Sequence, residues 1–180
     1  FKDFGVNIPG TIRFDKVNGK IRRDNDVLYL DSLSIISEGT DILINGEVKN
    51  ITYLFFNIEK DIEAKLDIKS SVFDMPNFLA FDPSIKRDFN HRILDVDVSV
   101  IAKTTTSKAT KFKSFPEIDF DIKKLDATVE NFLPRIEINS GKYKISESIL
   151  GFNMKLENIR TDFIGGKFNF SSEYNTSRYQ

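Results

Sequence analysis

The sequence predicts an all-β protein built on a mostly antiparallel sheet with one apolar face, several bulges and two short helical elements. Apolar residues alternate with polar or charged residues over residues 62–69, 94–100 and 118–123. A period of two is the period of a β-strand, because successive side chains point to opposite faces of the sheet. One face of the predicted sheet is therefore apolar and the other is polar.

The composition narrows the class of protein. The chain has 180 residues, a formal net charge of -1, 17 Phe, no Trp and no Cys. This length suits one domain or one slice of a repetitive protein. The balanced charge excludes the long-range attraction on which nucleic-acid binding depends. Without cysteine there are no disulfides and no thiolate metal sites, which suits a periplasmic protein.

The sequence contains no candidate membrane span, because no stretch reaches the required length of about 18 apolar residues. The chain begins at Phe1 and shows no signal peptide. We expect an excised fragment whose export signal or membrane anchor lies outside this sequence.

Three strands are predicted near the beginning of the chain, over residues 11–22, 27–36 and 41–49. In the first of them the apolar positions change parity across Asp15-Lys16. One extra residue reverses the alternation of side chains, so we predict a bulge there. Polar residues between the strands predict the two turns.

Two clusters of apolar residues interrupt the alternation and predict the helical elements. Residues 50–57 predict a short helix or a buried crossover, with Asn50 as its cap. Residues 72–81, around Pro76, predict a second short helix with irregular flanks. Between the two clusters, residues 58–70 return to strand alternation.

The second half of the chain predicts five strands, over residues 91–103, 117–129, 135–145, 150–159 and 167–174. Residues 104–113 are the stretch of lowest complexity, and they predict a flexible hairpin loop or a mobile edge. Ser140-Gly141 and Gly165-Gly166 predict turns or close approaches between backbones.

A weak internal repeat relates the two halves of the chain. Ile12 corresponds to Phe120, an offset of 108 residues (120 − 12), and the change of parity recurs at Lys123-Lys124. We therefore expect a single β-rich segment with two sub-repeats, over about residues 1–83 and 92–180.

The carboxylates and the single histidine offer little catalytic chemistry. His91 has no signalled partner for a triad or a metal site, and we expect an exposed loop residue. Paired carboxylates can hydrolyse glycosides or bind cations, but here they lie on the polar side of predicted strands, where solvated charge is expected. These carboxylates are Asp95, Asp97, Glu117, Asp119 and Asp121.

Two further motifs are incomplete, and a cluster of lysines forms no motif. Asp24-Asn25-Asp26 lacks the Gly and the distal Glu of a calcium loop. Gly165-Gly166-Lys167 lacks the leading glycine and the following Ser or Thr of a phosphate loop. Four lysines could contact phosphate or lipid headgroups, but we expect them to lie in a solvated loop: Lys103, Lys108, Lys111 and Lys113. The sequence therefore predicts no catalytic residue, no metal and no cofactor.

The apolar face is the strongest candidate for a functional surface. A sheet of about eight to ten strands with two short helical elements either folds over on itself or leaves an apolar groove partly open. Soluble monomers rarely expose an apolar patch of that size, so an open groove needs a ligand, and acyl chains suit it. We expect the groove to be lined by Ile12, Phe14, Ile42, Ile44, Ile62, Leu66, Ile68, Leu94, Val96, Val98, Val100, Ile118, Phe120 and Ile122.

The order of several short motifs resembles the AsmA-like family (AsmA/TamB type), which belongs among the bridge-like lipid-transfer proteins. The first motifs are Val17-Asn18-Gly19-Lys20-Ile21, Leu28-Tyr29-Leu30-Asp31-Ser32-Leu33-Ser34-Ile35 and Gly39-Thr40-Asp41-Ile42-Leu43-Ile44-Asn45-Gly46-Glu47-Val48-Lys49-Asn50. Later motifs are the short helix over residues 51–57, Leu66-Asp67-Ile68-Lys69-Ser70, the amphipathic turn over residues 73–79 and Ile164-Gly165-Gly166-Lys167-Phe168. The resemblance covers nearly the whole chain, and the wealth of Asn and Lys is similar to that of members from Bacteroidetes.

This resemblance implies a long, twisted, mostly antiparallel sheet curved into an apolar groove. It also implies a periplasmic protein anchored in the inner membrane by a segment absent from this chain. Its function would be non-enzymatic: it would accommodate or conduct the acyl chains of phospholipids in lipid transport and outer-membrane biogenesis. The family transfers no catalytic residues. We also expect edge-to-edge self-association and no nucleic-acid partner.

Two other function classes stay open. The same sheet could be a closed sandwich of a surface or scaffold protein that binds partners by edge-strand addition. A hydrolase acting through the Asp and Glu ladders is the third class.

Overall fold

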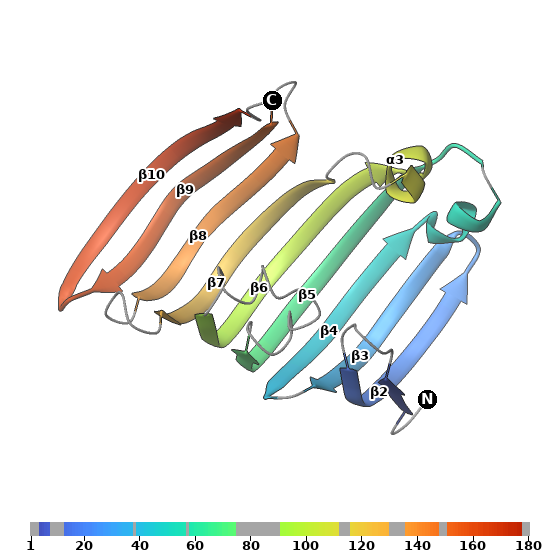
Figure 1. The fold of residues 1–180 in the computed structure, drawn as a ribbon, viewed down its shortest axis with the longest axis horizontal. Helices are drawn as coiled ribbons and strands as arrows, with labels where there is room; N and C mark the ends of the chain where they lie inside the picture. Colours follow the sequence, from blue (N-terminus) through green and yellow to red (C-terminus); the bar gives the residue numbers. More distant parts are fainter. Residues whose placement is uncertain are drawn as a thin grey trace.

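The computed structural model describes residues 4–7, 13–37, 39–56, 58–74, 91–111, 116–129, 136–147 and 151–177. Within them, ten strands form one sheet in which each strand pairs with its sequence neighbours (Figure 1). All of the pairings are antiparallel. The sheet is long, twisted and curved into an apolar groove, as predicted, and its described part carries two short helical elements.

Most strands lie close to their predicted ranges. β1 is the exception, because four residues are too few for an alternation to be recognised. The strands are β1 (Phe4–Asn7), β2 (Arg13–Asp24), β3 (Val27–Ser37), β4 (Thr40–Lys49), β5 (Asp61–Asp74), β6 (His91–Thr105), β7 (Glu117–Val129), β8 (Ile136–Glu147), β9 (Gly151–Phe163) and β10 (Gly166–Ser177).

The first helical element, the 3-10 helix η1 (Ile51–Phe55), confirms the predicted short helix. The prediction of its cap is wrong: Asn50 adopts the left-handed conformation, with φ 60°, and its side chain makes no capping hydrogen bond. Its side-chain amide instead donates to the backbone oxygen of Asp61, at 2.7 Å. The alternative of a buried crossover is also wrong, because Phe55 and Phe56 are exposed.

The second helical element is α3 (Thr106–Lys111), in the stretch predicted to be a flexible loop or mobile edge. That prediction is wrong, because contacts with a segment distant in the sequence hold Thr106. Its backbone N–H donates to the backbone oxygen of Lys60 at 2.9 Å, and its hydroxyl donates to that of Ile58 at 2.8 Å. The helix expected around Pro76 begins inside β5, which extends to Asp74, and the rest of it lies outside the described residues.

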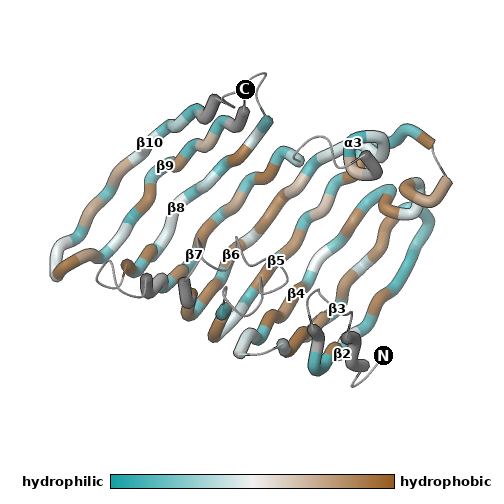
Figure 2. Tube along the Cα trace, viewed as in Figure 1, coloured by the Kyte–Doolittle hydropathy of each residue, from teal (hydrophilic) through white to brown (hydrophobic). Residues whose placement is uncertain are grey.

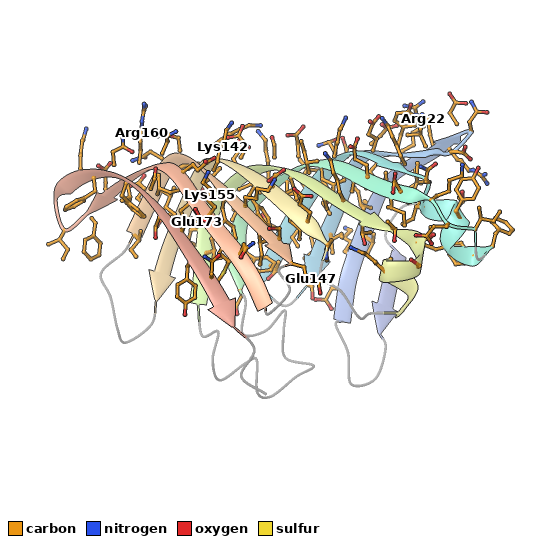
Figure 3. All side chains as sticks on the ribbon, turned by 90° about the horizontal axis from the view of Figure 1, so that it is seen from above. Arg22, Lys142, Glu147, Lys155, Arg160 and Glu173 are labelled. Atoms are coloured by element: carbon orange, nitrogen blue, oxygen red, sulfur yellow. The ribbon has the colours of Figure 1, made fainter. Side chains whose placement is uncertain are left out.

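The two faces of the sheet differ as the alternation predicts. Hydrophobic and hydrophilic residues alternate along the strands in Figure 2. Charged side chains project from the outer side of the arched sheet, among them Arg22, Lys142 and Arg160 (Figure 3). The apolar face is therefore the inner, concave one.

Register shifts confirm the two predicted bulges. Phe4 pairs with Val17 and Val6 pairs with Phe14, so one residue of β1 lies opposite the two residues Asp15-Lys16 of β2. In β7 the extra residue is Lys123. The division of the chain into sub-repeats stays a prediction.

Three further bulges contain a non-glycine residue with positive φ. They are Ser32 (51°), Asp95 (50°) and Asn158 (52°), in β3, β6 and β9. A bulge bends its strand and increases the local twist. Because these residues lie on every third strand, the bending is distributed across the sheet.

Two glycines permit unusually close strand packing. A Cβ at Gly46 would lie 2.0 Å from the backbone oxygen of Lys65, and one at Gly141 would lie 2.9 Å from the Cα of Ile159. Both glycines have positive φ, 147° and 156°. Gly141 thus confirms the close approach between backbones predicted at Ser140-Gly141. The turn predicted at Gly165-Gly166 is also confirmed, because the chain turns there between β9 and β10.

The carboxylate of Asp41 binds β5 just beyond the last registered pair between β4 and β5. It accepts hydrogen bonds from the backbone N–H groups of Ser71 (2.8 Å) and Val72 (2.9 Å), and from the hydroxyls of Ser70 (3.1 Å) and Ser71. Burial raises the pKa of this carboxyl, but the hydrogen bonds outweigh burial and hold the pKa below its ordinary value.

Candidate functional site

The apolar face is continuous across the middle of the sheet. In one row, Leu66 pairs with Val100, Val100 with Phe120, Phe120 with Tyr143 and Tyr143 with Leu156. The row crosses four inter-strand spacings of about 4.8 Å, which is about 19 Å. A parallel row joins Ile44, Ile68, Val98 and Ile122.

Most of the side chains expected to line a groove share this face. The pairings and packing place on it Ile42, Ile44, Ile62, Leu66, Ile68, Val96, Val98, Val100, Ile118, Phe120 and Ile122. Leu94 lies beyond the Asp95 bulge, opposite Asp126, and does not belong to the cluster around Val98. Ile12 and the side chain of Phe14 lie outside the described residues.

The centre of the apolar face holds a cluster of buried side chains. Val98, Val100 and Ile122 are 7%, 8% and 8% exposed, and partly buried neighbours pack around them. The rings of Phe120 and Tyr143 stack with centroids 5.6 Å apart. Burial raises the pKa of the Tyr143 hydroxyl. The face is therefore a low-dielectric surface that repels charge and accepts apolar groups.

The apolar face opens into a groove of about 330 Å³ over β8, β9 and β10. There Phe168 is 53% exposed and Phe170 is 44% exposed, although both lie against a largely apolar wall. The groove is lined by Ile136, Ile138, Ile159, Thr161, Phe163, Phe168, Asn169 and Phe170. None of these residues was predicted as a groove residue. The period-two pairs Ile136/Ile138 and Phe168/Phe170 were the signal that could have identified them.

Lysine–carboxylate pairs cover the opposite face. The ammonium of Lys144 lies 2.6 Å from Glu117 and 3.4 Å from Asp119. A hydrogen bond from Lys144 lowers the pKa of the Glu117 carboxyl, whereas a general acid at neutral pH needs a raised pKa. Similarly, the ammonium of Lys124 lies 3.1 Å from the carboxylate of Asp95, and that of Lys69 lies 3.1 Å from the carboxylate of Asp97. This arrangement suits a solvated outer face.

The remaining candidate residues are dispersed. His91 begins β6 and so does not lie in the loop expected for it; its side chain is outside the described part of the chain. Lys103 lies in β6, whereas Lys108 and Lys111 lie in α3, and Lys113 is outside the described residues. Among the described side chains, no three His, Cys, Asp or Glu residues are grouped as metal ligands would be.

No family model, no curated protein and no solved structure matches this chain. Neither helical element of the described residues has the length and apolar character required to cross a bilayer.

Proposed function

We propose that this chain is a non-enzymatic lipid module whose concave apolar face accommodates the acyl chains of phospholipids. The observation that carries the proposal is the unbroken apolar row from Leu66 to Leu156. The open groove beside Phe168 and Phe170 lies on the same face, because its wall residue Ile138 also packs against the cluster around Val98. Such a surface has a large hydrophobic contact area but no convergent polar groups that would select a polar substrate.

The proposed mechanism is passive. An acyl chain on the apolar face exchanges contact with water for contact with aliphatic and aromatic side chains, which is favourable by about 25 cal/mol per Å² of apolar area buried. Equivalent apolar positions recur on successive strands, so a chain can slide without meeting one deep minimum. The polar headgroup stays in water.

The proposal extends to the biological setting implied by the resemblance to the AsmA-like family. The module would act in the periplasm, attached to the inner membrane through a segment outside this chain, in lipid transport and outer-membrane biogenesis. The absence of Cys from the sequence is compatible with that compartment.

The test fills the apolar face without adding charge. Ala102 lies on that face, paired with Ala64 and Ile118, so Ala102→Trp places an indole ring where an acyl chain would lie. The control is Ile101→Trp, on the same strand but on the outer face, where Ile101 is 38% exposed. Lipid that co-purifies with each protein is extracted and quantified by mass spectrometry. Circular dichroism shows whether each variant is folded.

We expect the wild type and Ile101→Trp to carry phospholipid, and Ala102→Trp to lose most of it while it remains folded. A wild-type protein free of lipid would contradict the proposal. Unchanged lipid in Ala102→Trp would contradict it as well.

A second candidate, an interaction module that binds by strand addition, rests on β10. This strand ends the sheet and pairs with β9 alone among the described strands. A partner strand could add to its free edge. The closed sandwich considered with this function does not form in the described part of the chain, where all ten strands belong to one sheet.

A further inference from the structure

The strand β10 lies at the margin of the sheet and has a long edge that no described strand covers (Figure 1). It pairs with β9 on its other side. The bulge between these two strands lies in β9, where two residues face Ser171 alone, so β10 itself is regular. Residues 166–177 contain no Pro and only two charged residues, Lys167 and Glu173. The edge therefore has few of the features with which soluble proteins block strand addition.

The concave side of β10 is incompletely covered. Phe168, Phe170 and Tyr174 lie there and are 53%, 44% and 63% exposed. Ile159, which pairs with Phe170, is only 1% exposed, because strands flank it on both sides. A further strand beside β10 would cover the three rings in the same way.

The edge of β10 is complementary to a second copy of itself. Lys167 and Glu173 each lie three positions from Phe170. An antiparallel pairing centred on Phe170 therefore places Lys167 of each copy opposite Glu173 of the other, and Phe170 opposite its own equivalent. Opposed residues share a face, so the aromatic pair is concave and the ion pairs are on the outer face. The nearest registers that keep the faces matched place Lys167 opposite Ser171 or Asn175 instead, and neither register pairs the two charges.

This pairing would repeat a pattern that the sheet already contains. One row across β4, β5, β6 and β7 alternates in charge from strand to strand: Lys49, Glu63, Lys103 and Glu117. In β9, Asp162 lies opposite Lys167 and Lys155 lies opposite Glu173. Between two copies, Lys167 would lie between Asp162 of its own chain and Glu173 of the second copy. The joined sheets would therefore carry rows of four alternating charges, which are attractive at every step.

We propose that β10 is a dimerisation edge, which pairs antiparallel with β10 of a second copy of this chain about a two-fold axis at Phe170. The inference rests on the free edge of β10, the basis of the second candidate function, and names its partner. Such a contact occupies the β10 edges of both copies, so the assembly closes at two molecules. The two concave faces then join into one surface. Pairing does not depend on whether that surface carries lipid.

The first experiment measures dimerisation by sedimentation equilibrium in two variants with a reversed charge. In homodimers, Lys167→Glu and Glu173→Lys each place like charges opposite each other, so each should dimerise at least about tenfold more weakly than the wild type. An equimolar mixture of the two variants should regain dimers, because every opposed pair then has opposite signs. The control is Lys142→Glu, on the outer face of β8 (Figure 3), which should dimerise as the wild type does.

Recovery in the mixture also excludes misfolding as the cause, because each chain still carries its own substitution. A wild-type protein that stays monomeric up to its solubility limit overturns the proposal. A mixture no more dimeric than the separate variants overturns it as well. Assemblies of more than two copies would contradict it too, because they require an edge other than β10.

The second experiment tests the register and uses the absence of Cys from the chain. Phe170→Cys places two thiols beside the two-fold axis, on Cα atoms about 5 Å apart, so a short bismaleimide should crosslink them. Ile164→Cys is the control, at a residue that is 75% exposed. It lies six positions from Phe170, so its two copies would be about 40 Å apart. Equal crosslinking of the two variants, or none in Phe170→Cys, contradicts the register.

The variant Ala102→Trp separates dimerisation from lipid carriage. It fills the concave face but leaves β10 unchanged, so it should dimerise as the wild type does even when it has lost lipid. A lipid-free wild type that still forms the dimer supports the pairing and contradicts lipid carriage. A monomeric wild type that carries lipid overturns the pairing alone.

Discussion

The side-chain oxygen of Asn45 accepts a hydrogen bond, at 2.8 Å, from the backbone N–H of Ser32, the bulged residue of β3. A bulge leaves its extra residue outside the ladder of the sheet, and a neighbouring strand supplies the missing acceptor. The arrangement recurs in β9, where the N–H of Asn158 donates to the hydroxyl oxygen of Ser171 at 3.0 Å. Side chains of adjacent strands thus stabilise the bends that curve the sheet.

Asn45→Ala should destabilise the protein by about 1–2 kcal/mol, because the Ser32 N–H loses its protein acceptor. Asn45→Asp keeps an acceptor oxygen at the same position and should stay closer to the wild type. Urea denaturation measures both. Equal losses in the two variants would show that the hydrogen bond is not the cause.

Gly46→Ala should be more damaging, by about 2–4 kcal/mol, because its Cβ would lie 2.0 Å from the backbone oxygen of Lys65 and two strands would have to separate. Gly165→Ala is the control. Its φ is also positive, at 74°, but no atom lies within 4 Å of the added carbon. The control should cost about 1 kcal/mol, from backbone strain alone. Similar midpoints for the two variants would contradict the close approach.

Val98→Ala should destabilise the fold by about 1–3 kcal/mol, because it leaves a void beside Val100 and Ile122 in the buried cluster. Ile101→Ala, on the same strand but on the outer face, should change stability by about 0.5 kcal/mol or less. Thermal unfolding compares the two. An equal cost at both positions would mean that the faces are not packed differently.

The stability that Asp41 provides should depend on pH. Its pKa is lower in the folded protein than in the unfolded chain, where it is about 3.9. The carboxylate therefore stabilises the fold above that pH, and this contribution is lost as the pH falls through the folded pKa. At pH 7, Asp41→Asn should be less stable than the wild type by about 1–3 kcal/mol. Urea denaturation at a series of pH values should show the difference shrinking below about pH 4. A difference that grew in acid would contradict the assignment.

The strands and the two faces could be predicted from the sequence, because alternation is a local property of the chain. Charged residues beside Val98 and Phe120 in the sequence can only point to the other face. The bulge at Asp15-Lys16 was equally readable, since an extra residue reverses the alternation within the strand itself.

Other features depend on contacts between distant segments. The helix at Thr106 forms where the segment before β5 supplies hydrogen-bond acceptors from Ile58 and Lys60, which the residues of the helix alone do not reveal. Asn50 resembles a cap in the sequence, yet its amide is directed to Asp61.

The order of the residues is sufficient to predict a sheet with one apolar and one charged face, because the side chains of a strand must alternate. Which of the apolar residues are buried depends on how the strands pack together. Val98 is 7% exposed at the centre of the sheet, whereas Phe55 is 83% exposed on a turn at its margin. The physical reason is that burial depends on the strands packed around a side chain, and those neighbours are set by pairing across the sheet.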